Sequence, residues 1–133
     1  MVSKIYDNTD NFQIRVAPTT QVSLSDANQL KYYLGLDSAD NISEAVYSET
    51  LIGSIAYSLC AVKVKNDSAS SVASSMRSGV DPRKWICVEA ESVFTSTYGD
   101  YVLLVMADSA TANNIYQAFK TVTNNQCSAR VDR

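Results

Sequence analysis

Two glutamates separated by one residue are the strongest candidates for chemistry in this sequence. Glu89 and Glu91 follow the apolar run 85–88, which we predict to be the start of a β-strand. Side chains two apart on a strand project from the same face, so both carboxylates would lie together. Paired carboxylates can act as general acid and base or bind a hard cation. The more ordinary interpretation, which we favour, is that they line the solvent face of a half-buried strand.

The sequence contains no histidine, and this removes whole classes of enzyme. Ser-His-Asp and Cys-His nucleophile systems and histidine general bases are unavailable. The cysteines have no Cys-x-x-Cys spacing, so we predict no zinc site. We expect Cys60 and Cys87 to be small buried hydrophobic residues and Cys127 to be exposed. The four glycines form no phosphate-binding loop, and we predict neither a metal nor a cofactor.

Tyrosine is unusually frequent, with eight in 133 residues. Tyrosines bury a large area at low rotamer cost and keep a polar tip, which favours them at recognition surfaces, although they are also ordinary strand formers. Several aromatic residues are expected near one end of the predicted sheet, beside Arg83-Lys84. They would form a binding patch for a protein, peptide or glycan, consisting of Tyr57, Trp85, Tyr98 and Tyr101.

Length and charge limit the partners of the chain. A chain of 133 residues is in the range of one domain that folds without metal or disulfide. A net charge of −3, with both signs mixed along the chain, argues against nucleic acid and anionic membranes as partners. No window approaches the roughly 18 apolar residues of a membrane span, and residues 1–20 contain no apolar core of a targeting signal. We therefore expect either a cytosolic protein or one whose leader has been removed.

The clearest structural pattern runs from residue 98 to residue 110. Gly99-Asp100 predicts a II′ hairpin turn, the apolar run Tyr101–Met106 predicts a strand, and Asp108 predicts a helix N-cap. The strand is apolar at every position, so both of its faces need cover. We expect helices to cover one face and a homodimer partner or a lipid-like ligand to cover the other.

The remaining elements follow from periodicity and turn residues. Ser25 predicts the cap of a short helix that ends before Gly35. Residues 1–22 are expected to be an N-terminal extension with at most one edge strand near Phe12–Val16, residues 23–123 a single domain, and residues 124–133 a frayed tail. The predicted helices cover 26–34, 66–79 and 108–122, and the predicted strands lie within 42–50, 55–65, 85–98 and 101–106.

Two strand-helix segments share a pattern that determines the predicted fold. Tyr57–Ala69 and Tyr98–Ala110 match at a constant spacing of 41 residues, and each ends in Asp-Ser-Ala. The match is either a duplication or the common appearance of a strand that enters a capped helix. Two strand-strand-helix units predict an α+β fold, with a four-stranded, mainly antiparallel sheet, both helices packed on one face, and the helix 26–34 at an edge.

Three short segments of the chain resemble a bacterial family. They are Tyr33-Leu34-Gly35-Leu36, Ala61-Val62-Lys63-Val64-Lys65 and Tyr98-Gly99-Asp100-Tyr101-Val102-Leu103-Leu104-Val105. Over roughly Ser23 to Val122 the chain resembles the bacterial domain of unknown function family 4358. Members are typically small and carry a secretory or lipoprotein leader, so the resemblance implies an extracellular or cell-envelope location for this chain. It implies no activity and no catalytic or binding residue.

We therefore predict a non-catalytic, extracytoplasmic binding or protein-interaction domain of unknown ligand. Its expected partner is a second copy of the chain or a cell-envelope protein. The alternative is a carboxylate-dependent hydrolase that acts on cell-envelope glycans through Glu89 and Glu91. A third interpretation, a cytosolic structural subunit, applies if the location implied by the resemblance is wrong.

Overall fold

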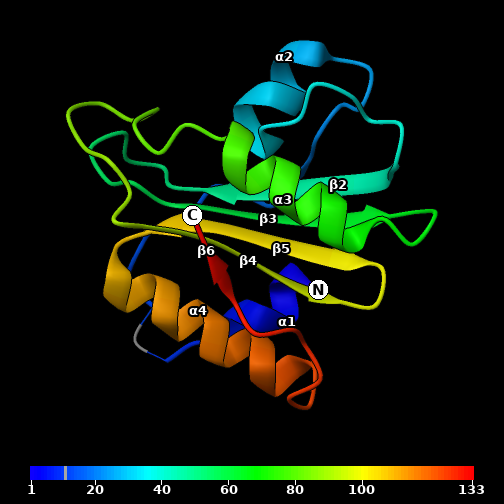
Figure 1. Ribbon diagram of the computed structural model, residues 1–133. Coiled ribbons are helices and arrows are strands. Elements are labelled where there is room, and N and C mark those ends of the chain that lie inside the picture. Colours follow the sequence, from blue (N-terminus) through cyan, green and yellow to red (C-terminus); the bar gives the residue numbers. More distant parts are fainter. Residues whose placement is uncertain (11) are drawn as a thin grey trace.

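One antiparallel sheet with helices on both faces makes up the fold (Figure 1). The structure is a computed structural model and describes residues 1–10 and 12–133. In these residues six strands are arranged in the order β1-β2-β3-β5-β4-β6. The strands are β1 Thr20–Gln21, β2 Ile42–Glu49, β3 Ser58–Val64, β4 Ser92–Tyr98, β5 Tyr101–Ala107 and β6 Val131–Asp132. The helices are α1 Val2–Asp7, α2 Ala27–Gln29, α3 Ala69–Gly79 and α4 Ser109–Val122, and one π-helical turn, η1, covers Leu30–Leu34.

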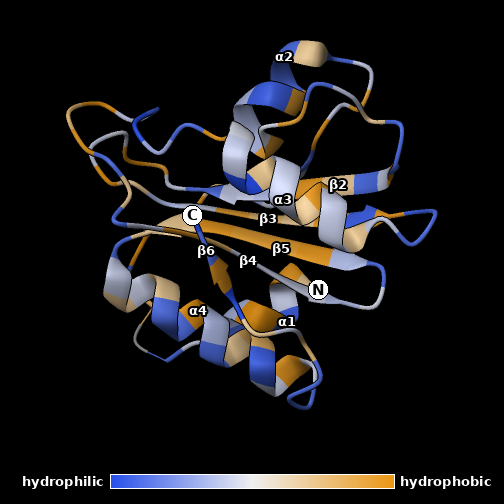
Figure 2. Cartoon of the chain, in the orientation of Figure 1, coloured by the Kyte–Doolittle hydropathy of each residue, from blue (hydrophilic) through white to orange (hydrophobic). Residues whose placement is uncertain are grey.

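The apolar strand β5 lies in the middle of the sheet, between β3 and β4. Leu104 and Met106 belong to the core beneath η1 and α3, whereas Leu103 and Val105 belong to the core shared with α1 and α4. The two helical layers lie on opposite sides of the sheet in Figure 1, and the central strands are the most apolar in Figure 2. The prediction that both helices pack on one face is therefore wrong, because an all-apolar strand is covered from both sides within one chain.

The sheet has two edge strands beyond the predicted four. The predicted strands form its centre, β2-β3-β5-β4, and all of their pairings are antiparallel. At one edge β1 pairs with β2 around Tyr47, and at the other β6 pairs with β4, where Val131 lies opposite Thr95. The predicted frayed tail thus contains a strand. The N-terminal segment also supplies α1, which packs on α4 and buries Val2 and Ile5.

The strand predicted to begin at Trp85 begins seven residues later, at Ser92. Residues 80–91 form a loop that is closed by a hydrogen bond of 2.8 Å from the Ala90 amide to the Pro82 carbonyl oxygen. Within the loop Cys87 has a φ of 58°, which is incompatible with an extended strand. Because this left-handed residue turns the chain, the apolar run 85–88 does not enter the sheet, and the prediction of a strand there is wrong.

The helix and hairpin ends follow the local residue types. Gly99 turns the hairpin between β4 and β5 with a φ of 56°, as predicted, and Gly35 ends η1 with a φ of 71°. Asp108 caps α4, with its Oδ1 accepting a hydrogen bond of 2.8 Å from the Thr111 amide. The cap of α2 is Asp26 and not the predicted Ser25. Glycine thus occupies both of these positions with positive φ, and aspartate caps both of these helix starts.

The two Asp-Ser-Ala segments have different backbone conformations. Asp108 is extended and caps its helix, whereas Asp67 has a φ of 52° and Ser68 is the N-cap of α3. The sequence match therefore marks a strand-to-helix connection in both places but not the same cap.

The cysteines lie in three different environments, and none of them forms a disulfide. Cys60 is buried in the centre of the sheet, as predicted. Cys87 is exposed on the loop 80–91, so the prediction that it is buried is wrong, for the same reason that its strand is absent. Cys127, predicted to be exposed, is half-buried against the core beside α4.

Candidate functional site

Two loops and the π-helical turn meet at one end of the sheet, which we call the loop end. The loop 50–57 joins β2 to β3, and the loop 80–91 joins α3 to β4. The Ile86 amide donates a hydrogen bond of 2.9 Å to the Gly53 carbonyl oxygen, so the two loops are joined directly. The turn η1 reaches the same place through a hydrogen bond from Lys84. Three segments far apart in the sequence therefore form one surface.

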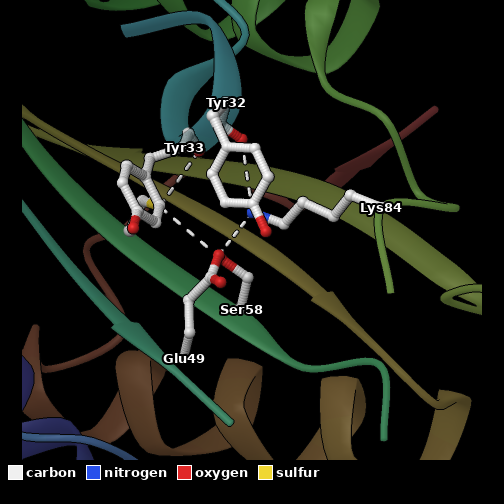
Figure 3. Close-up of polar contacts among 6 residues, drawn as sticks. Tyr32, Tyr33, Glu49, Ser58 and Lys84 are labelled. Atoms are coloured by element: carbon white, nitrogen blue, oxygen red, sulfur yellow. Dashed lines mark hydrogen bonds and ion pairs between the residues drawn. The ribbon is translucent and has the colours of Figure 1, made fainter. Parts of the chain in front are cut away.

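A buried ion pair lies at the centre of the loop end (Figure 3). Lys84 Nζ donates a hydrogen bond to Glu49 Oε2 and another, of 3.2 Å, to the carbonyl oxygen of Tyr32. The side chain of Lys84 is only 4% exposed and that of Glu49 is 13% exposed. Each charge is thus removed from most of its water and stabilised by the other, so the loss of one partner leaves an uncompensated buried charge.

Aromatic rings surround the ammonium group of Lys84. The distances from Nζ to the ring centroids are 4.2 Å for Tyr32, 5.2 Å for Tyr33 and 5.3 Å for Trp85. Each lies within the range at which the negative face of a ring attracts a cation. We call the three rings, the Glu49 carboxylate and the Tyr32 carbonyl the ammonium cage. Its parts come from η1, β2 and the loop 80–91.

The local sequence explains why two neighbouring tyrosines both reach Lys84. Asp26 caps the start of the helix and Gly35 ends it, and between them the chain widens to a π-helical turn, a conformation that is frequent at functional sites. Tyr33 stacks on Tyr47 of β2, with 3.7 Å between the centroids and 10° between the ring planes. This stacking fixes the turn on the sheet, and Tyr32 then lies over Lys84.

A thiol and a hydroxyl lie next to the ammonium cage on the same face of the sheet. Cys60 Sγ donates a hydrogen bond of 3.3 Å to the Tyr33 carbonyl oxygen, and Ser58 Oγ lies 3.8 Å from that sulfur. Burial raises the pKa of the Cys60 thiol to about 12, and burial is also the main cause that raises the pKa of the Tyr33 phenol. Both groups therefore stay protonated near neutral pH, which favours binding over proton transfer or nucleophilic attack.

An open groove of about 610 Å³ runs beside the ammonium cage. Tyr32, which is 47% exposed, forms part of its wall, and Lys84 also lines it. The rest of the groove carries amide, carboxylate and ammonium groups. Its lining residues are Asn28, Gln29, Lys31, Tyr32, Tyr33, Gly79, Asp81 and Lys84.

Three large aliphatic side chains are exposed at the loop end. Leu51 is 63% exposed, Ile52 is 44% exposed and Ile86 is 70% exposed. They come from the two loops that the hydrogen bond between Ile86 and Gly53 joins, and we call them the apolar tip. Single exposed aliphatic residues are common, but a group on adjoining loops is typical of an interaction surface.

The four residues of the predicted aromatic patch do not gather on one surface. Tyr57 is fully buried, and its hydroxyl lies 2.9 Å from that of Tyr6 in the core beside α1. Trp85 is half-buried in the ammonium cage. Tyr98 and Tyr101 are paired across the hairpin, at the opposite end of β5 from Ser58. Of the four, only Trp85 lies at the site described here.

The two glutamates proposed for catalysis have separate structural roles. Neither lies on a strand, because both precede β4. Glu91 Oε1 accepts a hydrogen bond of 2.9 Å from the Ser109 amide at the start of α4, and Glu89 forms an exposed ion pair of 2.9 Å with Arg83. Among the described residues no group of three or more His, Cys, Asp or Glu side chains could hold a metal ion.

The residues at the centre of the site belong to no pattern that the sequence shows locally. In the sequence Lys84 stands out only as a neighbour of the predicted aromatic patch, and no pattern marks Glu49. One signal was available, because Tyr32-Tyr33 immediately precedes Leu34-Gly35, which placed two rings on the last turn of a helix. Nothing in the sequence related that turn to Lys84, which is 52 residues away from Tyr32.

Comparisons with known proteins add no relative. No model of a known protein family matches this chain, and searches of curated proteins and of solved structures found no match. No helix in the described part of the chain is long and apolar enough to span a membrane. The resemblance to family 4358 stays a prediction, and the contacts of the loop end are the basis for a function.

Proposed function

We propose that this chain is a non-catalytic binding domain that docks a protein partner on the apolar tip. The observation that carries the proposal is the exposure of Leu51, Ile52 and Ile86 on two loops that are hydrogen-bonded to each other. Fully burying an exposed aliphatic side chain is worth about 1.5 to 3 kcal/mol, and each of these, at 44 to 70% exposed, would gain about half of that in an interface. Contact of these three side chains with water is unfavourable, and a partner that covers them removes this cost.

The ion pair beneath the tip supports this proposal, because it holds the tip in place. Lys84 is attached to the sheet through Glu49, and Ile86 follows it by two residues. A surface that is ordered before binding loses less conformational freedom when the partner arrives. A loop that exposes aliphatic side chains and is held by a buried ion pair is therefore better suited to binding a partner than a loop that has no such ion pair.

Charge favours a protein over other partners. The net charge of −3 opposes binding to nucleic acid or to an anionic membrane. Because members of the family that the chain resembles typically carry a secretory or lipoprotein leader, we infer a partner in the cell envelope and an extracytoplasmic location. The earlier reason to expect a homodimer, an uncovered face of β5, is removed by α1 and α4, which cover that face.

No observation favours the hydrolase alternative. The carboxylate of Glu91 is engaged at the start of α4 and that of Glu89 at Arg83, so the two are not directed at a shared substrate. The groove lies instead beside Lys84 and Asp81. A binding role accounts for the loop end without a reacting group.

The proposal is tested by chemical cross-linking in the organism that produces the protein. The variant Ile86→Asp places a charge in the tip, and Tyr98→Asp is the matched control, because Tyr98 is a 36% exposed aromatic residue at the opposite end of the sheet. We expect Ile86→Asp to lower the yield of one cross-linked protein about tenfold or more, since 1.4 kcal/mol is a factor of ten. Tyr98→Asp should leave that yield unchanged.

Ile86→Asp is on the surface and should change the free energy of unfolding by no more than about 0.5 kcal/mol. Tyr98→Asp removes a ring that pairs with Tyr101 across the hairpin and should cost about 1 kcal/mol, so urea unfolding checks that both variants remain folded. Equal loss of the cross-link in both variants would refute the assignment of the interface to the tip. A cross-link to a second copy of the chain alone would replace the envelope partner with self-association.

A further inference from the structure

We propose that the ammonium cage is a recognition site for a primary alkylammonium ligand, and that Lys84 fills it as an internal ligand in this structure. The proposal concerns the cage and its groove and does not depend on a partner at the apolar tip. It assigns a ligand class to a part of the molecule that the proposed function uses only as an anchor.

The cage offers each interaction that an alkylammonium group needs. Glu49 supplies a carboxylate, the Tyr32 carbonyl supplies a hydrogen-bond acceptor 3.2 Å from the nitrogen, and the rings of Tyr32 and Tyr33 supply two π faces. Aromatic rings around a cation, with a carboxylate at the base, are the chemistry by which proteins recognise amines. A neutral ligand of the same shape would leave the carboxylate buried without a counter-charge.

Most of the cage is held in place without Lys84. Tyr33 is fixed by its stacking on Tyr47, and its carbonyl group accepts a hydrogen bond from Cys60. Glu49 lies on β2, directly opposite Ser58 of β3. Only Trp85 comes from the same loop as Lys84. The site is therefore formed by the sheet and η1, and the lysine is the part that enters it.

The groove supplies a route by which an external ligand could reach the cage. Tyr32 and Lys84 line the groove, and the Tyr32 ring is also part of the cage, so a ligand in the groove lies against a wall that the two sites share. Lys84 itself lies on the loop 80–91, which contains no helix or strand. An external ammonium group must compete with a lysine tethered at a high effective concentration, so contacts along the groove would have to add to its affinity.

The test replaces Lys84 with alanine and adds back the missing atoms as a free ion. Lys84→Ala lacks three carbons and the ammonium group, which n-propylammonium chloride supplies, and n-propanol is the uncharged control of similar size. Thermal unfolding is recorded with each additive, with sodium chloride at equal ionic strength. At 100 times its Kd the ion should raise the melting temperature of the variant by about 10 °C, and n-propanol should not.

Two further variants make the result specific. Lys84→Ala combined with Glu49→Gln should lose the response to n-propylammonium, because the carboxylate is gone. The wild type should show a much smaller response, because its cage is filled. Equal stabilisation of Lys84→Ala by n-propylammonium and n-propanol, or an unchanged response in the double variant, would overturn the proposal.

If Lys84→Ala does not fold, the wild type provides the measurement. Acylation of lysines by a reagent in excess is followed by mass spectrometry with increasing n-propylammonium chloride. Consumption of the reagent by the added amine cancels when the rates of two lysines are compared. Displacement of Lys84 should raise its acylation rate relative to that of Lys4, which is exposed on α1, on the other side of the sheet. A constant ratio across the series would then overturn the proposal.

Discussion

The buried pair of Lys84 and Glu49 gives the sharpest prediction about stability. The substitution Lys84→Met keeps an unbranched side chain of similar length and removes its ammonium group. Glu49, which is 13% exposed, then keeps a buried negative charge without its partner. Removing one member of a buried pair typically costs about 3 to 5 kcal/mol of unfolding free energy, and we expect a loss of that size here.

A second ion pair on the same loop is the matched control. Arg83 and Glu89 are joined at 2.9 Å, but their side chains are 78% and 58% exposed. Pairs in water contribute about 0 to 1 kcal/mol, so Arg83→Met should have only a small effect. The two substitutions change neighbouring residues by the same chemistry and differ mainly in burial.

Urea unfolding of the wild type, of Lys84→Met, of Glu49→Gln and of the double variant completes the measurement. The double variant should cost less than the sum of the single ones, by about 0.5 to 3 kcal/mol, because it buries no unpaired charge. If Lys84→Met costs no more than Arg83→Met, the reasoning that burial makes this pair important for the fold is wrong.

Three further predictions follow from single residues. Burial raises the pKa of the Cys60 thiol from 9.0 to about 12, so only the unfolded chain ionises it between these values. The free energy of unfolding should not depend on this thiol below pH 9 and should fall by about 1.4 kcal/mol per pH unit above pH 9. Above pH 9 the urea midpoint of the wild type should therefore fall more steeply with pH than that of Cys60→Ala. Gly79→Ala should lower the free energy of unfolding, measured with urea, by about 1 to 3 kcal/mol or more, as overpacking does. The new Cβ would lie 1.8 Å from the Gly35 carbonyl oxygen, whereas the Cβ of Gly53→Ala would meet only the flexible side chain of Ile86, at 3.3 Å. With a thiol reagent, mass spectrometry should detect Cys87 as the first modified cysteine and Cys60 only after unfolding, because Cys87 is exposed and Cys60 is not.

Local patterns in the sequence were sufficient for the central part of the fold. The Gly99-Asp100 turn, the strand that follows it and the Asp108 cap depend on residues near one another in the chain, and the structure has them as predicted. The antiparallel order of β3, β5 and β4 follows from the hairpin and the apolar runs. The N-terminal helix and the last strand gave no such signal, because both are stabilised by packing on distant elements.

The site depended on contacts that no local pattern contains. The run 85–88 has strand propensity, but the left-handed Cys87 and the inward side chain of Lys84 make it a loop. Tyr57 has the residue type of a recognition surface and is instead part of the core beside α1. The ammonium cage joins η1, β2 and the loop 80–91 through charge and ring contacts that act only after the sheet has formed. The sequence by itself therefore determined the central hairpin, the apolar strand β5 and the capped helix that follows it. The tertiary structure alone decided which side chains meet, because burial and charge pairing depend on distances in space.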